Sequence, residues 1–360
     1  MEISLVEIEN PVTWDEELIE YQASIFLSSL WLQSVATQSR VPVFFKFFAD
    51  YKEIARISGL MICPAADKLK LLFFYSGIVS KLRDPEIISK CRLALLNYAR
   101  TNGISRIIIR SYDDKNCTQT RLPAFKINKR VEYVICLERD KDMILEGFHR
   151  SARRVVRKAR TAGVSVGISK SVQLYDLLFE MMTETRHRRK RKGYGDYNAL
   201  SIPFFDRSAM LNLLKEDKAS LFYAEDKEGI LSVVFIFHHI NVSYAILTGT
   251  TARGYELDVS ACLLYEIAIT LKDKGCRYLN LGGVPSGKKN SGIVQFKKSL
   301  GTDVVESCEE STNFILFPWT LFNPLLFLRR KLPDRPFFRF CKKAMRKFME
   351  IILTPDSSVL

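Results

Sequence analysis

The sequence predicts an α/β protein of two related lobes, and both its length and a repeated pattern support this fold class. With 360 residues, the chain is longer than one typical domain. Residues 47–62 and residues 222–237 each place a charged Asp/Lys/Glu turn between two apolar strands, which is the pattern of a β-hairpin. Each hairpin precedes a helical stretch, a glycine and a further apolar strand. A hairpin followed by a helix–strand unit, present twice, indicates two α/β lobes.

The two helix–strand units correspond element by element. In the first, a helix expected over residues 87–102 ends at Gly103 and leads into a strand at 104–109. In the second, a helix expected over 259–274 ends at Gly275 and leads into a strand at 276–281. A glycine after a helix supplies the left-handed residue that ends it. Chance matching of short apolar patterns is the alternative, but the common order and similar offset favour a repeat.

The composition is that of a folded, basic protein. Hydrophobic residues make up 47% of the chain and charged residues 26%, which excludes an intrinsically disordered chain. The formal net charge is +14, and the pI is near 9.3. Such an excess of cations favours polyanionic partners, namely nucleic acid, a nucleotide diphosphate or an anionic membrane face.

The cysteines and the N-terminus point to the cytoplasm and away from a metal site. The eight cysteines form no CxxC pair, and no histidine is spaced to complete a zinc site with them. Residues 1–10 carry acids where a signal peptide carries positive charge. The best candidate for a membrane span, 314–328, is short and interrupted by Pro318, Asn323 and Pro324. We therefore expect a cytoplasmic protein with no metal, and peripheral contact with the inner face of the membrane stays open.

Three basic segments stand out. Residues 150–160 place small apolar residues at helical spacing, which predicts a helix with a narrow apolar stripe and a basic opposite face. Residues 186–192 end the next helical run with a second cluster of cations. Both clusters can bind a polyanion, although a solvated face is the usual reading of a charge run and cations also suit a helix C-terminus.

The third segment, 334–353, predicts a basic amphipathic helix near the C-terminus. Its aromatic and aliphatic residues share one side and its Arg and Lys residues the other. A helix of this kind lies on an anionic membrane or docks on a partner. Docking against the protein's own core is the alternative.

Four segments carry a family resemblance. They are the basic stretch 148–163, the Arg-rich stretch 185–205 with Gly193-Tyr194 and Phe204-Phe205, the stretch Tyr244 to Gly249, and Leu281-Gly282-Gly283 continued by Gly292, Phe296-Lys297 and Gly301. In this order they resemble the FemAB-like (Fem family) peptidoglycan aminoacyl transferases and the related BioF2-like acetyltransferase domains. Both groups belong to the GNAT superfamily. The resemblance spans about residues 145 to 310 and is weaker over the N-terminal lobe.

The resemblance implies two tandem GNAT-like lobes, each with the acyl-CoA N-acyltransferase fold. We accordingly expect an N-terminal lobe at 1–145, a C-terminal lobe with the family motifs at 146–312, and a C-terminal extension at 313–360. The extension would return in part to the first lobe and carry the basic helix. The acceptor would bind in the cleft between the lobes.

The donor is predicted from a departure from the acetyl-CoA pattern. GNAT enzymes that use acetyl-CoA hold its pyrophosphate with a Gly-rich turn at a helix start. The corresponding turn, 252–260, has one glycine and two acids, Glu256 and Asp258. Fem-type enzymes, which take the acyl group from aminoacyl-tRNA, also lack the Gly-rich turn. We therefore expect aminoacyl-tRNA as co-substrate, with acyl-CoA as the alternative, and no bound cofactor.

The acceptor departs from the family pattern too. The family often has a Lys shortly after an early Trp, which contacts a phosphate of the acceptor. After Trp31, the nearest basic residue in this chain is Arg40. This difference disfavours an acceptor that carries a nucleotide diphosphate.

The candidate catalytic residue is Lys297. Acyl transfer to an amine needs hydrogen-bond donors aimed at the developing oxyanion, and the resemblance puts Phe296-Lys297 in the donor channel. The alternatives are that Lys297 binds a tRNA phosphate or is an exposed lysine on a strand. The candidate substrate-binding residues are Arg186 and Arg189 for an acceptor phosphate or carboxylate, Tyr194 and Tyr244 in the acceptor cleft, Gly282 and Gly283 for close backbone approach, and Phe296.

These residues favour a Fem-like N-acyltransferase that moves an aminoacyl or acyl group onto an amine of a cell-envelope precursor, either peptidoglycan or another glycan. An acyltransferase that uses acyl-CoA or an acyl-carrier protein is the first alternative. The second alternative is a non-catalytic GNAT-fold protein that binds RNA or a membrane. Basic charge alone supports this second alternative equally well, because phosphate contacts supply most non-specific affinity.

Overall fold

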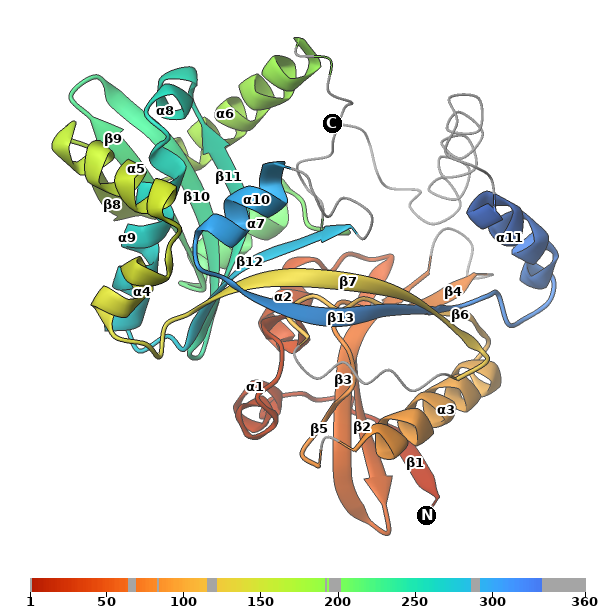
Figure 1. The fold of residues 1–360 in the computed structure, drawn as a ribbon. Coiled ribbons are helices and arrows are strands. Elements are labelled where there is room, and N and C mark those ends of the chain that lie inside the picture. The colour runs from red at the N-terminus through yellow and green to blue at the C-terminus, as the bar shows by residue number, and fades with distance from the viewer. Residues whose placement is uncertain are drawn as a thin grey trace. The chain divides into compact units, whose positions relative to one another are not determined.

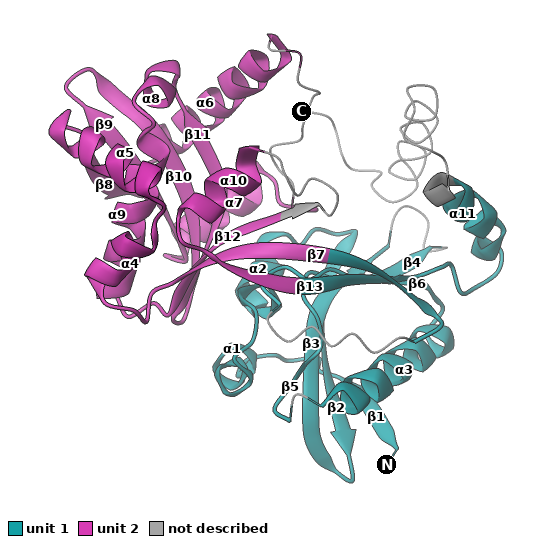
Figure 2. Cartoon of the chain, in the orientation of Figure 1, with its two compact units in different colours: residues 1–129, 307–360 teal, residues 130–306 magenta. Residues whose placement is uncertain are grey.

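The structure is a computed structural model that describes residues 2–63, 69–82, 84–114, 122–191, 193, 202–285 and 292–331. The chain divides into two compact units (Figure 2). Unit 1 comprises residues 1–129 and 307–360, and unit 2 comprises residues 130–306. The divisions fall at 129/130 and 306/307, whereas the sequence predicted them at 145/146 and 312/313. The helix expected at 334–353 lies outside the described residues.

Unit 1 is an α/β unit with the strand order β1-β2-β3-β4-β6-β13. Its elements are β1 (Ile3–Glu7), α1 (Trp14–Glu17), the 3-10 helices η1 (Leu18–Tyr21) and η2 (Ile25–Leu27), α2 (Ser29–Ser34), β2 (Arg40–Ala49), β3 (Lys52–Ile62), β4 (Lys70–Phe74), β5 (Val79–Ser80), α3 (Pro85–Thr101), β6 (Ile104–Ile109), the first part of β7 (Phe125–Cys136), the last part of β13 (Asp303–Thr312), η3 (Trp319–Phe322) and α11 (Asn323–Lys331). Strands β2 and β3 form the expected hairpin. It turns at Asp50 and Tyr51, both with positive φ, as a two-residue hairpin turn requires.

Helix α3 connects the parallel strands β4 and β6 and packs against β1 and β6. Its start follows from local sequence: the Asp84 side chain accepts a hydrogen bond from the backbone N–H of Glu86, and Pro85 fills the first helical position. Beyond its end, Gly103 has a φ of +71°. The helix at 87–102 and the strand at 104–109 expected from the sequence are thus confirmed.

Strand β13 reaches unit 1 from the far end of the sequence. Glu310 lies opposite Ile109 of β6 in the antiparallel ladder. Its buried carboxylate lies 2.5 Å from the guanidinium of Arg92 on α3, and the side chains of this pair are 4% and 7% exposed. The backbone N–H of Ile107 donates to the hydroxyl of Thr312. An ion pair that is shielded from water therefore holds the end of β13 against α3.

Unit 2 has the strand order β7-β12-β11-β10-β9-β8 (Figure 1). Its elements are the last part of β7, α4 (Lys141–Gly147), α5 (Arg150–Thr161), β8 (Ser165–Ser169), α6 (Val172–Arg191), α7 (Arg207–Lys215), β9 (Ala219–Asp226), β10 (Gly229–His239), β11 (Val242–Thr250), α8 (Ala252–Glu256), α9 (Val259–Asp273), β12 (Tyr278–Pro285), α10 (Gly292–Ser299) and the first part of β13. Strands β9 and β10 form the second expected hairpin, and α9, Gly275 and β12 repeat the order of α3, Gly103 and β6. The prediction of two related α/β lobes is confirmed.

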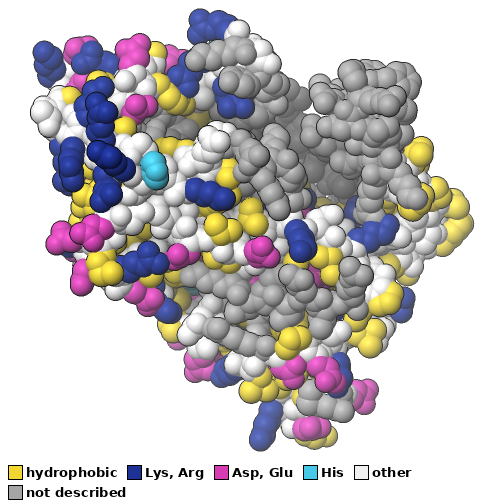
Figure 3. Space-filling view, in the orientation of Figure 1, with side chains coloured by type: hydrophobic (Ala, Val, Ile, Leu, Met, Phe, Trp, Pro, Cys, Tyr) yellow, Lys and Arg dark blue, Asp and Glu magenta, His cyan; other side chains and the backbone are white. Residues whose placement is uncertain are grey.

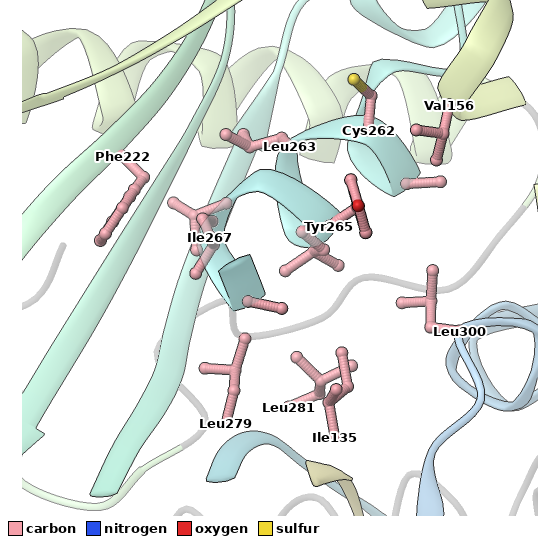
Figure 4. Packing of buried hydrophobic residues seen from close by; sticks show 14 of the residues in the cluster. Ile135, Val156, Phe222, Cys262, Leu263, Tyr265, Ile267, Leu279, Leu281 and Leu300 are labelled. Atoms are coloured by element: carbon pink, nitrogen blue, oxygen red, sulfur yellow. The ribbon is translucent and has the colours of Figure 1, made fainter. Parts of the chain in front are cut away.

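Both faces of the unit 2 sheet are covered. Val234 and Ile236 of β10 belong to the same core cluster as the apolar residues of α9 and α5, and Figure 4 shows Leu263 and Ile267 of α9 in this cluster with Phe222 of β9. Phe235, which alternates with them on β10, contacts Phe205, with ring centroids 6.1 Å apart. Since successive residues of a strand point to opposite faces, one face packs on α9 and the other on the segment before α7. In the described ranges, no helix is long and apolar enough to span a bilayer.

Replacing Arg92 by Met tests the ion pair that holds β13. Breaking a buried pair by removing one partner costs about 3–5 kcal/mol, so we expect the free energy of unfolding to fall by about 3 kcal/mol at pH 8. Burial raises the pKa of Glu310 from 4.5 to about 7, with Arg92 opposing and Asp114 reinforcing the shift. The stability that the protonated carboxyl contributes is therefore lost as the pH rises through 7, and the effect of Arg92→Met should be smaller at pH 5 than at pH 8. Urea titrations of wild type and Arg92→Met at both pH values measure this difference in the free energy of unfolding.

The double variant Arg92→Met/Glu310→Leu is the control, because it removes both charges and should recover most of the loss. A double variant as unstable at pH 8 as the single one would contradict the role assigned to this pair.

Candidate active site

The site lies where two parallel strands of unit 2 part. Strand β11 pairs with β12 only from Val242 to Tyr244, opposite Tyr278 to Asn280. Beyond Asn280, β12 shifts its register and continues against β7. Ligands of open α/β sheets bind beyond the carboxyl ends of such strands. The point of divergence is therefore the place in this lobe where backbone groups become available to a ligand.

Gly282 and Gly283 form the irregularity at this point. The register between β12 and β7 shifts between Asn280 and Gly283, and Gly282 has a φ of +73°, a conformation that side chains other than glycine rarely adopt. A Cβ atom on Gly283 would lie 2.6 Å from the carbonyl oxygen of Val131 on β7. Both glycines were predicted to allow close backbone approach. In the structure, Gly283 allows the close approach of the neighbouring strand β7. The carbonyl of Gly282 accepts a hydrogen bond from Lys297.

Lys297 lies on helix α10, buried against this irregularity. Its Nζ donates to the carbonyl oxygens of Leu281 and Gly282 at 2.6 and 2.9 Å. The residue is 8% exposed, so the alternative of an exposed strand lysine is wrong on both counts. An ammonium group carries three N–H donors. Two of them meet these carbonyls, and no residue in the described ranges accepts the third.

A buried carboxylate joins the three strands beside Lys297. Glu132 of β7, which is 1% exposed, accepts a hydrogen bond from the hydroxyl of Tyr244 at 2.9 Å and one from the side-chain amide of Asn280 at 2.8 Å. Arg130 forms an ion pair with the same carboxylate at 3.1 Å. The side-chain oxygen of Asn280 in turn accepts from the backbone N–H of Gly282 at 2.8 Å. Glu132 thus holds β7, β11 and β12 together and orients the carbonyls that bind Lys297.

The surroundings of Lys297 lower its pKa. Burial lowers the pKa of Lys297 from 10.5 to about 8, against the opposing charge of Glu132 and together with that of Arg130. The ring of Tyr133, 5.7 Å from Nζ, lies over the ammonium group, and cations are attracted to such a ring face. Lys297 is therefore mainly protonated at pH 7, but it titrates within the range in which enzymes operate.

The other predicted residues differ in how close they lie to this cluster. Tyr244 is part of it through Glu132, and Phe296, one residue before Lys297, packs half-buried against the unit 2 core. Arg186 and Arg189 are exposed near the end of α6, an element that contributes no side chain to the Glu132–Lys297 contacts described above. Tyr194 lies outside the described residues.

The turn 252–260 departs structurally from a phosphate-binding turn. Its glycine, Gly254, is buried, and a Cβ there would lie 2.4 Å from the carbonyl oxygen of Leu231, so this glycine serves packing on β10. Asp258 is exposed and immediately precedes α9, with a left-handed φ of +52°. Its side chain makes no capping hydrogen bond, but the residue adds a negative charge at the helix start, where a phosphate would otherwise be favoured.

Comparison with known proteins assigns the second unit. Residues 147–298 match the family model described as "Acetyltransferase (GNAT) domain". Unit 2 contains a GNAT domain. This GNAT domain includes both Tyr244 and Lys297. No curated protein sequence is significantly similar to the chain.

Solved structures resemble most of the chain in fold. FemX superposes with a TM-score of 0.67 at 14% identity, over 90% of this chain and 99% of FemX. L-PGS from Bacillus licheniformis gives a TM-score of 0.50 at 13% identity, over 89% of this chain and 94% of the other. A conserved protein of unknown function from Bacteroides thetaiotaomicron VPI-5482 gives 0.50 at 11% identity, over 86% and 99%. These likenesses show a shared fold and confirm the resemblance to the Fem group and to GNAT proteins.

Three residues of β7 in the cluster, and Asn280 of β12, were absent from the predicted site residues. Glu132, Arg130 and Tyr133 lie on β7, in a stretch of alternating polar and apolar residues that reads as an ordinary strand. The buried half of β7 holds one acid, Glu132, among apolar neighbours. Buried carboxylates are rare unless paired. A Glu inside an apolar strand was therefore the sequence signal that could have identified Glu132 as a site residue.

Replacing Gly283 by Ala tests the close approach of β12 to β7. The added Cβ meets backbone that cannot move without separating the strands, so we expect a fall of several degrees in the unfolding temperature and loss of any activity that depends on Lys297. Gly292→Ala, at the start of α10, is the matched control, because a Cβ there has nothing within 4 Å. Thermal unfolding of both variants measures the difference. A Gly283→Ala variant as stable as Gly292→Ala would contradict the proposed constraint.

Proposed function

We propose that this protein is an N-acyltransferase that moves an aminoacyl or acyl group onto an amine of a cell-envelope precursor, with Lys297 as hydrogen-bond donor to the oxyanion. The GNAT domain supports acyl transfer as the reaction class. The role of Lys297 rests on one observation. Two carbonyls fix its buried ammonium group, and no described residue accepts its third N–H. A donor held rigidly in a site shielded from water stabilises developing charge most effectively.

The reaction needs no covalent intermediate on the enzyme. The neutral amine nitrogen of the acceptor attacks the carbonyl carbon of the donor ester, and the C–N bond forms as the carbonyl oxygen becomes an oxyanion. Lys297 Nζ–H donates to this oxygen. The C–O ester bond then breaks, and the departing hydroxyl takes up the proton lost by the amine nitrogen. Lys297 keeps its proton throughout.

A basic helix beside the site supports aminoacyl-tRNA as the donor. Helix α5 starts next to α10, because the backbone N–H of His149 donates to the carbonyl of Ser299 at 2.8 Å. Several Lys and Arg side chains gather over α5 (Figure 3). Among the described residues, five cations of this helix have no ion-pair or hydrogen-bond partner: Arg150, Arg153, Arg154, Arg157 and Lys158. A row of unpaired cations suits an RNA backbone, and the start of α5 lies beside the end of α10, the helix that carries Lys297.

Acyl-CoA is the second candidate donor, and the match to an acetyltransferase domain favours it. The exposed Asp258 and the packed Gly254 of the turn 252–260 disfavour it, since a pyrophosphate there would meet a carboxylate. A cell-envelope acceptor rests on the Fem-family resemblance. Membrane contact through 334–353 concerns residues outside the described ranges.

A transfer assay tests the proposal. The protein is incubated with an amine-bearing envelope precursor and either aminoacyl-tRNA or acyl-CoA, and the product is detected by its mass. We expect transfer from aminoacyl-tRNA. The rate for Lys297→Ala should be roughly 10²–10³-fold lower, which is the usual effect of removing one hydrogen-bond donor to the oxyanion. Lys298→Ala, on the exposed side of the same helix, is the control and should retain activity. Absence of transfer from both donors would refute the enzymatic proposal.

The pH dependence of the rate distinguishes a protonated from a neutral Lys297. Because the proposed donor must keep its proton and its pKa is about 8, kcat should fall as the pH rises through 8. Lys297→Arg should lose this falling limb, since a guanidinium does not titrate there. A rate that instead rises through pH 8 and is lost in Lys297→Arg would show that the lysine acts as a base.

Glu132→Gln tests the carboxylate that faces Lys297. Removal of its negative charge leaves Arg130 and burial to lower the pKa of Lys297 further, so the falling limb should move to lower pH. Glu310→Gln, which neutralises another buried carboxylate in unit 1, is the matched control and should leave the limb in place. An unchanged limb in Glu132→Gln would mean that Glu132 only holds the strands.

A further inference from the structure

An apolar face without charge lies at the end of the described chain. Residues 313–328 contain no Asp, Glu, Lys or Arg. They nevertheless expose large apolar side chains on η3, on α11 and just before η3, and yellow side chains gather over α11 in Figure 3. The exposed fractions are 78% for Phe317, 67% for Leu321, 43% for Leu325, 53% for Phe327 and 47% for Leu328. We call these five residues the 317–328 face. Contiguous exposed apolar side chains of this size mark an interaction site.

The 317–328 face is presented by a well-fixed segment. The backbone N–H of Phe314 donates to the side-chain oxygen of Asn323 at 2.8 Å, and the side-chain amide of Asn323 donates back to the carbonyl of Phe314 at 2.9 Å. Trp319 and Phe322 stack with ring centroids 6.0 Å apart, and Leu326 is buried. The segment therefore has its own inward anchors. Because these contacts hold one side of the segment inward, its other side, which carries the 317–328 face, is exposed.

The spacing of the leucines makes this side continuous. Leu321, Leu325 and Leu328 follow one another at intervals of four and three residues, which places them on one face of a helix. Asn323 keeps a helical conformation where η3 passes into α11. The leucines thus form one row, with Phe317 before it and Phe327 beside it.

The charged residues that follow the face in the sequence are all basic up to Lys331. The sequence continues α11 with Arg329, Arg330 and Lys331, and no acid occurs from Ser311 to Lys331. An apolar helix face flanked by cations suits the boundary of an anionic bilayer, where the apolar side chains enter the acyl region and the cations meet lipid headgroups.

We propose that the 317–328 face rests on the surface of an anionic lipid bilayer. The face belongs to unit 1 and shares no residue with the Lys297 site of unit 2, so this proposal does not depend on the reaction. Its consequence is that the protein works at a membrane surface, where a lipid-linked substrate is concentrated.

Co-sedimentation of the full chain with vesicles tests the proposal. The two vesicle types are equimolar phosphatidylglycerol and phosphatidylcholine, and phosphatidylcholine alone. The test variant is Leu321→Ser/Leu325→Ser/Leu328→Ser. We expect wild type to bind the anionic vesicles at least about tenfold more strongly than the neutral ones, and the variant to bind the anionic vesicles at least about tenfold more weakly than wild type.

A matched control carries the same change elsewhere on unit 1. Val12, Ile19 and Leu82 are 80%, 55% and 68% exposed, and their triple serine variant should bind vesicles like wild type. Both triple variants should unfold at the temperature of wild type, because the replaced side chains are exposed.

Three outcomes would overturn the proposal. Equal vesicle binding by wild type and the 317–328 variant would assign the attraction to basic surfaces such as α5. A wild-type dimer that the variant converts to a monomer, without vesicle binding by either, would assign the face to a second copy. A lower unfolding temperature of the variant with unchanged vesicle binding would assign it to a segment of the chain itself.

Discussion

The buried carboxylate of Glu132 is the contact on which the candidate site depends. It joins strand β7 to Tyr244 of β11 and Asn280 of β12, and through Asn280 it fixes the backbone at Gly282, whose carbonyl holds Lys297. A carboxylate in such a place is costly unless it is fully hydrogen-bonded. Three donors meet that requirement here. The same negative charge also limits how far burial lowers the pKa of Lys297, so one group sets both the position and the protonation of the candidate catalytic residue.

Local sequence patterns were sufficient to predict the elements of both lobes. The hairpins depend on neighbouring residues, and the helices α3 and α9 end at the glycines that their sequence supplies. The resemblance was also sufficient to select Lys297, but it gave no indication that this lysine lies on a helix or is buried. Those properties arise from α10 packing against an irregularity in β12, which no local pattern encodes.

Glu132 could not be found in the same way, because its partners are far away in the sequence. Tyr244 and Asn280 lie 112 and 148 residues further along the chain. In isolation, the stretch around Glu132 reads as one more strand with a polar residue. The chemistry of that residue depends on the order β7-β12-β11, which places a strand from the start of unit 2 beside one from its end. Topology of this kind follows from the packing of the whole lobe.

The return of β13 constrains how the chain folds as it is made. Residues 307–312 belong to the strand that pairs with β6, yet they are synthesised after every residue of unit 2. While the ribosome is still translating the GNAT domain, the hydrogen-bonding edge of β6 and the buried guanidinium of Arg92 have not yet met the strand that covers them. The N-terminal unit therefore completes its fold only after the catalytic lobe has left the ribosome, which links the assembly of the two units in time.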